Sequence, residues 1–164
     1  MIAALVLAAA TAMQLHSGDF TDGGAMSTQL MSADCIGANH SPSLDWTGAP
    51  AGTKSFALIM RDPDAPVAGG FIHWVLFDLP PNTKQLPGDA SLEAGQTGLG
   101  TSGKAAYYGP CPPPGKPHHY VFTLYALDIS HAGTSGATDA AKLGKAIAGH
   151  VLATATLRAT ASNP

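Results

Sequence analysis

The sequence predicts a loop-rich, mainly β protein, and three observations support this. Glycine and proline are abundant, at 19 and 13 of the 164 residues, and the turns that they mark are closely spaced. Apolar runs of strand length lie between these turns. A single segment, near the C-terminus, has convincing helical periodicity.

Length and composition indicate one domain. With 164 residues, 45% of them hydrophobic, the chain can bury a sizeable core. Only 12% of the residues are charged, the net charge is -3, and the pI is about 6.1. No cluster of Lys and Arg appears, which argues against nucleic acid and against a general affinity for anionic membranes.

The N-terminal segment has features of an export signal. Residues Met1–Ala12 are apolar and uncharged and end in small residues, as before a signal-peptidase site, although no Lys or Arg precedes them. The stretch is too short to span a bilayer. We therefore expect residues 1–15 to be a signal peptide, residues 16–164 to form the single domain, and the protein to be periplasmic or secreted. The alternative is a buried N-terminal strand in a cytoplasmic protein.

The chain has two cysteines, Cys35 and Cys111, and no Cys-x-x-Cys motif, so a zinc knuckle or a thioredoxin-type centre is unsupported. In an exported protein a lone pair of cysteines usually forms a disulfide. In a cytosolic protein the two would remain separate buried thiols.

Five segments are expected to form strands. Met26–Met31 is expected to form a short strand. Lys54–Arg61 is apolar on both faces and is closed by Asp-Pro, which fits a central strand. Phe71–Leu79 and His119–Asp128 are rich in β-branched and aromatic residues. Ala153–Thr160 alternates well enough to form the last strand.

Thr138–Leu152 is the segment expected to form the helix. Thr138 can cap it, and Leu143, Ile147 and Val151 repeat at intervals of four to form a packing stripe. Residues 87–103 read as an extended loop dominated by Gly, Ser and Thr.

Polar side chains gather where three of these strands meet solvent. Asp62 follows its strand and His73 opens the next, so both lie at one end of the sheet if the strands are antiparallel. His118 and Tyr120 open the third strand and can reach the same rim. Strict alternation places His73 on the face of Val75. Buried polar groups need partners, so we expect these to bond to one another and to a ligand.

Proline-rich loops border this rim. Pro63 and Pro66 restrict the first loop, and five prolines between Pro110 and Pro117 restrict the second. Such loops lose little entropy when they hold a ligand, which suits a pre-formed site. Asp62-Pro63 is a candidate cis peptide.

The motifs in these segments resemble the phosphatidylethanolamine-binding protein family, in particular its bacterial branch, which is often labelled Raf kinase inhibitor-like. The resemblance runs from about Asp19 to Ala159. The matching segments are Asn39–Trp46, Gly52–Ala57, Asp62–Pro66, His73-Trp74, Gly109–Pro113, His118–Tyr120 and Leu143–His150.

This resemblance implies a β-sandwich with a large central sheet, a C-terminal helix packed on it and an anion pocket at the sheet edge. It implies ligand-binding roles for the following residues: Asp62, His73, Gly109, Pro112, His118 and Tyr120. It also implies that Cys35 and Cys111 are paired. No catalytic residue, metal or cofactor is expected. Two departures alter the pocket rim: Phe71 and Ile72 stand where bacterial relatives often have tryptophans, and an aromatic residue usual near Ser102 is missing.

Three functions are compatible with these residues. The first is a non-enzymatic binding protein for a small anion or phosphorylated headgroup, with affinity that falls as the histidines deprotonate. The second is a metal-dependent or acid–base hydrolase that uses Asp62, His73 and His118, although no His-x-His spacing or nucleophile motif supports it. The third is a regulator that binds a protein partner, such as a serine protease inhibitor.

Overall fold

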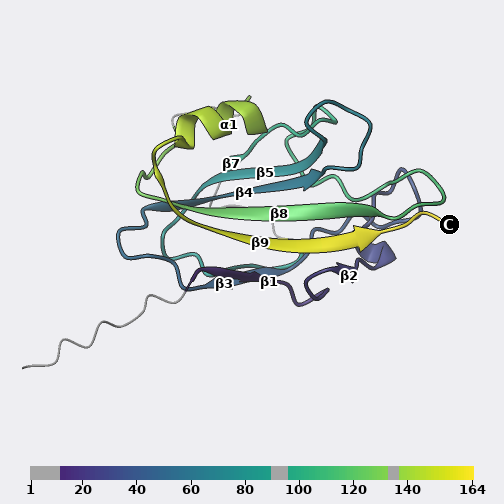
Figure 1. The fold of residues 1–164 in the computed structure, drawn as a ribbon, viewed down its shortest axis with the longest axis horizontal. Coiled ribbons are helices and arrows are strands. Elements are labelled where there is room, and N and C mark those ends of the chain that lie inside the picture. The colour runs from purple at the N-terminus through teal and green to yellow at the C-terminus, as the bar shows by residue number, and fades with distance from the viewer. Residues whose placement is uncertain (1–11, 90–95, 133–136) are drawn as a thin grey trace, which may run out of the picture.

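The computed structural model describes residues 12–89, 96–132 and 137–164. Two β-sheets pack face to face, and a helix covers the outer face of the larger sheet (Figure 1). The larger sheet has the order β2 (Gly24–Ala25), β9 (Val151–Ala161), β8 (His118–Leu127), β4 (Ser55–Asp62), β5 (Phe71–Leu79) and β7 (Gln96–Thr97). The smaller sheet has the order β1 (Gln14–His16), β3 (Leu44–Thr47) and β6 (Gln85–Leu86). The mainly β sandwich with one C-terminal helix confirms the predicted fold class.

The three long apolar runs form the centre of the larger sheet. β4 lies between β5 and β8 and is antiparallel to both. Both faces of β4 are buried, because Phe56, Leu58 and Met60 pack toward the smaller sheet while Ala57 and Ile59 pack toward the helix. This two-sided burial explains why the run is apolar at successive positions rather than alternating.

The helix α1 (Ala140–Ile147) is shorter than predicted. Its N-cap is Asp139 rather than Thr138, because the Asp139 carboxylate accepts a hydrogen bond of 2.8 Å from the backbone N–H of Lys142. Gly149, with φ of 82°, turns the chain out of the helical path. Val151 therefore belongs to β9 and not to the helical stripe, whose buried members are Leu143 and Ile147.

Two other local predictions are corrected. The segment Met26–Met31 forms a 3-10 turn, η1 (Thr28–Leu30), instead of a strand, because the N–H groups of Leu30 and Met31 bond to carbonyls three residues earlier. The Asp62–Pro63 bond is trans, since the described residues contain no cis peptide.

The folded domain begins before residue 16. Met13 and Leu15 are buried in the core between the sheets, and Leu15 pairs with Trp46 of β3. The predicted signal segment 1–15 lies largely outside the described residues, and cleavage after Ala12 would leave β1 intact. Within the described part of the chain, no helix is long and apolar enough to cross a membrane.

Candidate functional site

A cavity of about 190 Å³ lies at the end of the larger sheet where β4 ends and where β5 and β8 begin. It opens among side chains from all three strands and from the two proline-rich loops. The lining residues are Asp62, Ala65, Pro66, Phe71, His73, Tyr108, Cys111, Pro112, Pro113, His118 and Tyr120. Larger hollows occur elsewhere on the described surface, but this one combines two imidazoles, a carboxylate and phenols.

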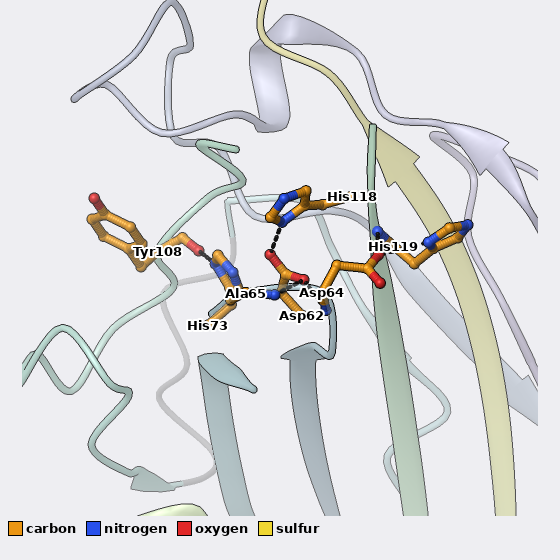
Figure 2. Close-up of polar contacts among 7 residues, drawn as sticks. All are labelled: Asp62, Asp64, Ala65, His73, Tyr108, His118 and His119. Carbon is orange, nitrogen blue, oxygen red and sulfur yellow. Dashed lines mark hydrogen bonds and ion pairs between the residues drawn. The ribbon is translucent and has the colours of Figure 1, made fainter. Parts of the chain in front are cut away.

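Asp62 holds His118 in a defined orientation. The Nδ1–H of His118 donates to Oδ2 of Asp62 at 2.7 Å, while Oδ1 of Asp62 accepts from the backbone N–H groups of Asp64 and Ala65 at 2.8 and 3.1 Å (Figure 2). The carboxylate is thus engaged at both oxygens and is 4% exposed. Its main effect is to fix the loop after β4 and to leave Nε2 of His118 free to meet a ligand.

His73 is oriented by the backbone of Tyr108. The Nδ1–H of His73 donates to the carbonyl oxygen of Tyr108 at 2.7 Å, and the residue is 4% exposed. Burial lowers the pKa of His73, an effect that the Tyr108 carbonyl and the Asp62 charge partly oppose. The ring is therefore neutral over a wider pH range than an ordinary histidine.

A β-bulge places His73 on the cavity side of the sheet. Met60 pairs with Trp74 and Arg61 pairs with Ile72, so His73 is an extra residue of β5 without a partner on β4. Trp74 packs between the sheets, and the ring of His73 lies 5.2 Å from that of Tyr120 on the same side. The prediction from strict alternation, which grouped His73 with the helix-facing Val75, is wrong for this reason.

Tyr120 contributes a hydroxyl group that lacks a partner. The residue is fully buried, and its hydroxyl has no hydrogen-bond partner among the described residues. Burial raises the pKa of Tyr120, and the charges of Asp62 and Asp64 add to this, so the phenol stays protonated and able to donate. An unpaired buried hydroxyl costs about 1–3 kcal/mol, which a bound acceptor would recover.

The loop 107–113 forms one wall of the cavity. Asn39 holds it by two hydrogen bonds, accepting from the N–H of Gly109 at 2.8 Å and donating to the carbonyl of Tyr107 at 3.3 Å. Gly109 packs against the backbone of residues 30–32, where a Cβ would meet Leu30 O at 2.4 Å, and it is not among the lining residues, but its backbone contacts the His73 ring and raises the pKa of that histidine. Pro112, the other predicted wall residue, does line the cavity.

A disulfide ties the same wall to the loop after η1. It joins Cys35 to Cys111, whose Cα atoms are 5.8 Å apart, and closes a separation of 76 residues. The hydroxyl of Tyr108 donates to Asp34 at 2.9 Å beside this bridge. Cys111 and Tyr108 themselves line the cavity, so the disulfide and this hydrogen bond both restrain the rim.

Neighbouring polar residues lie outside the cavity. His119 donates from its backbone N–H and from Nδ1 to Oδ2 of Asp64, both at 2.7 Å, and Figure 2 shows this pair turned away from His73. The hydrogen bonds from His119 lower the pKa of Asp64. Trp46 and Trp74 are buried core residues.

Sequence reasoning named Asp62, His73, His118, Tyr120 and Pro112, and the structure brings these five to one cavity. It missed Asn39, which is separated by about 70 residues from the loop that it holds. Among the described residues, no group of three or more His, Cys, Asp or Glu side chains is arranged to hold a metal ion.

The fold and site define a β-sandwich protein with a small cavity, into which imidazole, carboxylate and phenol groups converge, at one end of its larger sheet. The family model described as phosphatidylethanolamine-binding protein matches residues 16–162. The chain belongs to this phosphatidylethanolamine-binding protein family, in agreement with the resemblance of its motifs.

Relatives of bacterial type are similar over nearly the whole chain. The UPF0098 protein YbcL of Escherichia coli (strain K12) is 37% identical over 158 residues, which cover 90% of this chain and 86% of YbcL. The solved structure of YbcL superposes with a TM-score of 0.88 and covers 94% of this chain and 100% of that one. A relative named as a lipoprotein, LppC of Mycobacterium tuberculosis (strain H37Rv), is 39% identical over 137 residues, covering 79% of this chain and 63% of LppC.

Proposed function

We propose that the protein is a non-enzymatic binding protein for a small oxyanion, either phosphate or a phosphorylated headgroup, which occupies the cavity between His73 and His118. The observation that carries this proposal is the buried hydroxyl of Tyr120, which has no partner among the described residues. This hydroxyl lies near the imidazoles of His73 and His118. The Nδ1 atom of each ring already forms a hydrogen bond within the protein, so each Nε2 atom is available to a ligand.

Asp62 gives this cavity a pH-dependent preference. An ionised carboxylate repels an anion, but a protonated His118 would stand between the two and donate to both. The anion would then accept from Nε2–H of His118 and from the Tyr120 hydroxyl. Loss of the His118 proton leaves a lone pair at Nε2 and an uncompensated Asp62 charge, which both oppose an anion.

We therefore expect affinity for phosphate and phosphoethanolamine to be higher at pH 5.5 than at pH 8. We expect binding at pH 8 to be about tenfold weaker, because a hydrogen bond to a charged group contributes about 1.5–3 kcal/mol. Isothermal titration calorimetry at the two pH values measures it.

Phosphate itself titrates in this interval, so the decisive comparison is with variants. His118→Asn should bind more weakly at pH 5.5 and lose the part of the pH dependence that His118 contributes, so its affinities at the two pH values should differ less than those of the unchanged protein. His119→Asn, at an exposed position outside the cavity, should keep it. Equal affinity of the unchanged protein at both pH values would contradict the proposal.

We also propose that the protein resides in the cell envelope or is secreted. Two observations support this location: the Cys35–Cys111 disulfide, which persists in oxidising compartments, and the similarity to a relative named as a lipoprotein. Cell fractionation with an antibody to the folded domain tests it, and recovery of the protein with reduced thiols in the cytoplasm would contradict it.

A further inference from the structure

We propose that the cavity selects an oxyanion that carries a proton of its own, such as phosphate or a phosphomonoester, over sulfate and over phosphodiesters. This inference rests on the proposed oxyanion-binding function and names the class of ligand at that site. Its basis is the hydrogen-bonding state of His73, which the backbone of the wall loop determines.

The carbonyl of Tyr108 decides which nitrogen of His73 carries the proton. A carbonyl oxygen can only accept, and it lies 2.7 Å from Nδ1, so Nδ1 bears the hydrogen. A neutral imidazole has one N–H, and Nε2 therefore presents a lone pair. The backbone of Gly109 also acts on this ring and raises its pKa, but the hydrogen bond that meets normal geometry runs from Nδ1, and none joins Nε2 to another described residue, so this acceptor is available to a ligand hydroxyl.

The surroundings of His73 favour a proton on the ligand rather than on the ring. The residue is 4% exposed and lies on the cavity wall. The titratable groups that face it are Asp62, His118, Tyr120 and Tyr108, and no Lys or Arg is found among the described lining residues. Burial lowers the pKa of His73, in keeping with a neutral ring that accepts.

A protonated oxyanion can form a hydrogen bond with each of these groups. Its P–OH donates to Nε2 of His73, while its unprotonated oxygens accept from the hydroxyl of Tyr120 and from His118. A phosphomonoester has its second pKa at about 6 and so carries a P–OH in most of its population at pH 5.5. Sulfate and phosphodiesters have no such hydrogen, and they would place an oxygen lone pair against the lone pair of Nε2.

Calorimetric titration of the full chain at pH 5.5 and constant ionic strength, with four ligands, tests the selectivity. Inorganic phosphate is compared with sulfate, which has the same size, and phosphoethanolamine is compared with its diester, glycerophosphoethanolamine. We expect the two ligands with a P–OH to bind at least about tenfold more tightly than their counterparts, because the counterparts lose the hydrogen bond to Nε2 and leave it unpaired in a buried site.

The variant His73→Asn assigns the selectivity to Nε2. Its side-chain amide retains an N–H for the Tyr108 carbonyl but has no group at the position of Nε2, so the ratio of phosphate to sulfate affinity should fall toward one. His119→Asn is the matched control, since that ring bonds to Asp64 outside the cavity, and its ratio should stay as in the unchanged chain.

Every other outcome contradicts the selectivity, the oxyanion-binding function, or both. Equal affinities for phosphate and sulfate, or an unchanged ratio in folded His73→Asn, would overturn the selectivity and leave the oxyanion-binding function in place. Absence of binding by all four ligands would overturn both. If His73→Asn does not fold, the four-ligand comparison on the unchanged chain decides the inference by itself.

Discussion

At the scale of single residues, the groups around the cavity differ in how much of their hydrogen-bonding capacity the protein itself uses. Asp62 is engaged at both carboxylate oxygens, and His73 and His118 are each engaged at Nδ1. Tyr120 has no bond from its hydroxyl to any described residue. The capacity left over is two imidazole nitrogens and one hydroxyl, which is a set suited to a small oxyanion.

Tyr120→Phe should weaken phosphate binding without lowering stability. The substitution removes a buried unpaired hydroxyl, so the free energy of unfolding should stay the same or rise by about 1 kcal/mol. Phosphate affinity should fall about tenfold or more, because hydrogen bonds to charged groups contribute about 1.5–3 kcal/mol. Urea unfolding and calorimetric titration measure the two effects.

Tyr107→Phe is the matched control for this experiment. The hydroxyl of Tyr107 is buried but donates to the Leu30 carbonyl at 2.8 Å, and the residue does not line the cavity. Its removal should lower stability by about 1 kcal/mol or more and leave affinity unchanged. Loss of stability without loss of affinity in Tyr120→Phe would contradict the proposed role.

Spacing in the sequence was enough to group Asp62, His118 and Tyr120, because each lies at or near the end of a mostly apolar run of strand length. The face on which His73 lies was not predictable in this way. Its position depends on an extra residue in β5, and alternation in the sequence does not reveal where pairing with β4 slips.

At the scale of elements, the two faces of the larger sheet have different roles. The side that faces the smaller sheet carries the cavity at one end. The helix α1 covers the other side (Figure 1), where Leu143 and Ile147 are buried. Short helices depend on their caps and on packing for stability. Weakening the cap of α1 should therefore affect stability without affecting the cavity.

Asp139→Ala should lower the free energy of unfolding by about 1 kcal/mol, because the Lys142 N–H loses its side-chain acceptor. Asp139→Asn should preserve most of the stability, since asparagine caps helices about as well as aspartate. Thermal unfolding of both variants measures the difference. A clear loss of phosphate affinity in folded Asp139→Ala would show that the two sides of the sheet are coupled.

At the scale of the whole molecule, the disulfide connects segments that are far apart in the sequence. It joins the loop after η1 to the wall of the cavity across 76 positions. Asn39, in the same region, bonds to the backbone on both sides of Tyr108. The position of the Tyr108 carbonyl, and with it the proton on His73, thus depends on contacts between distant parts of the chain.

Replacement of both Cys35 and Cys111 by serine should lower the free energy of unfolding by up to about 4 kcal/mol in the chain-entropy model. Affinity for phosphate should also fall, because Cys111 lines the cavity. Urea unfolding with and without reductant measures the effect, and the variant should be insensitive to reductant. Unchanged stability of the native chain after full reduction would contradict a structural role for the bridge.

The sequence by itself determined the mainly β class, the three central strands and the strand ends at which the polar residues gather. These features depend on local composition: strand-length apolar runs, closely spaced turns and proline-stiffened loops. The tertiary structure alone decided the bulge at His73 and the contacts of Asn39. Each of these depends on which distant backbone atoms meet, and pairing between remote segments leaves little trace in the order of nearby residues.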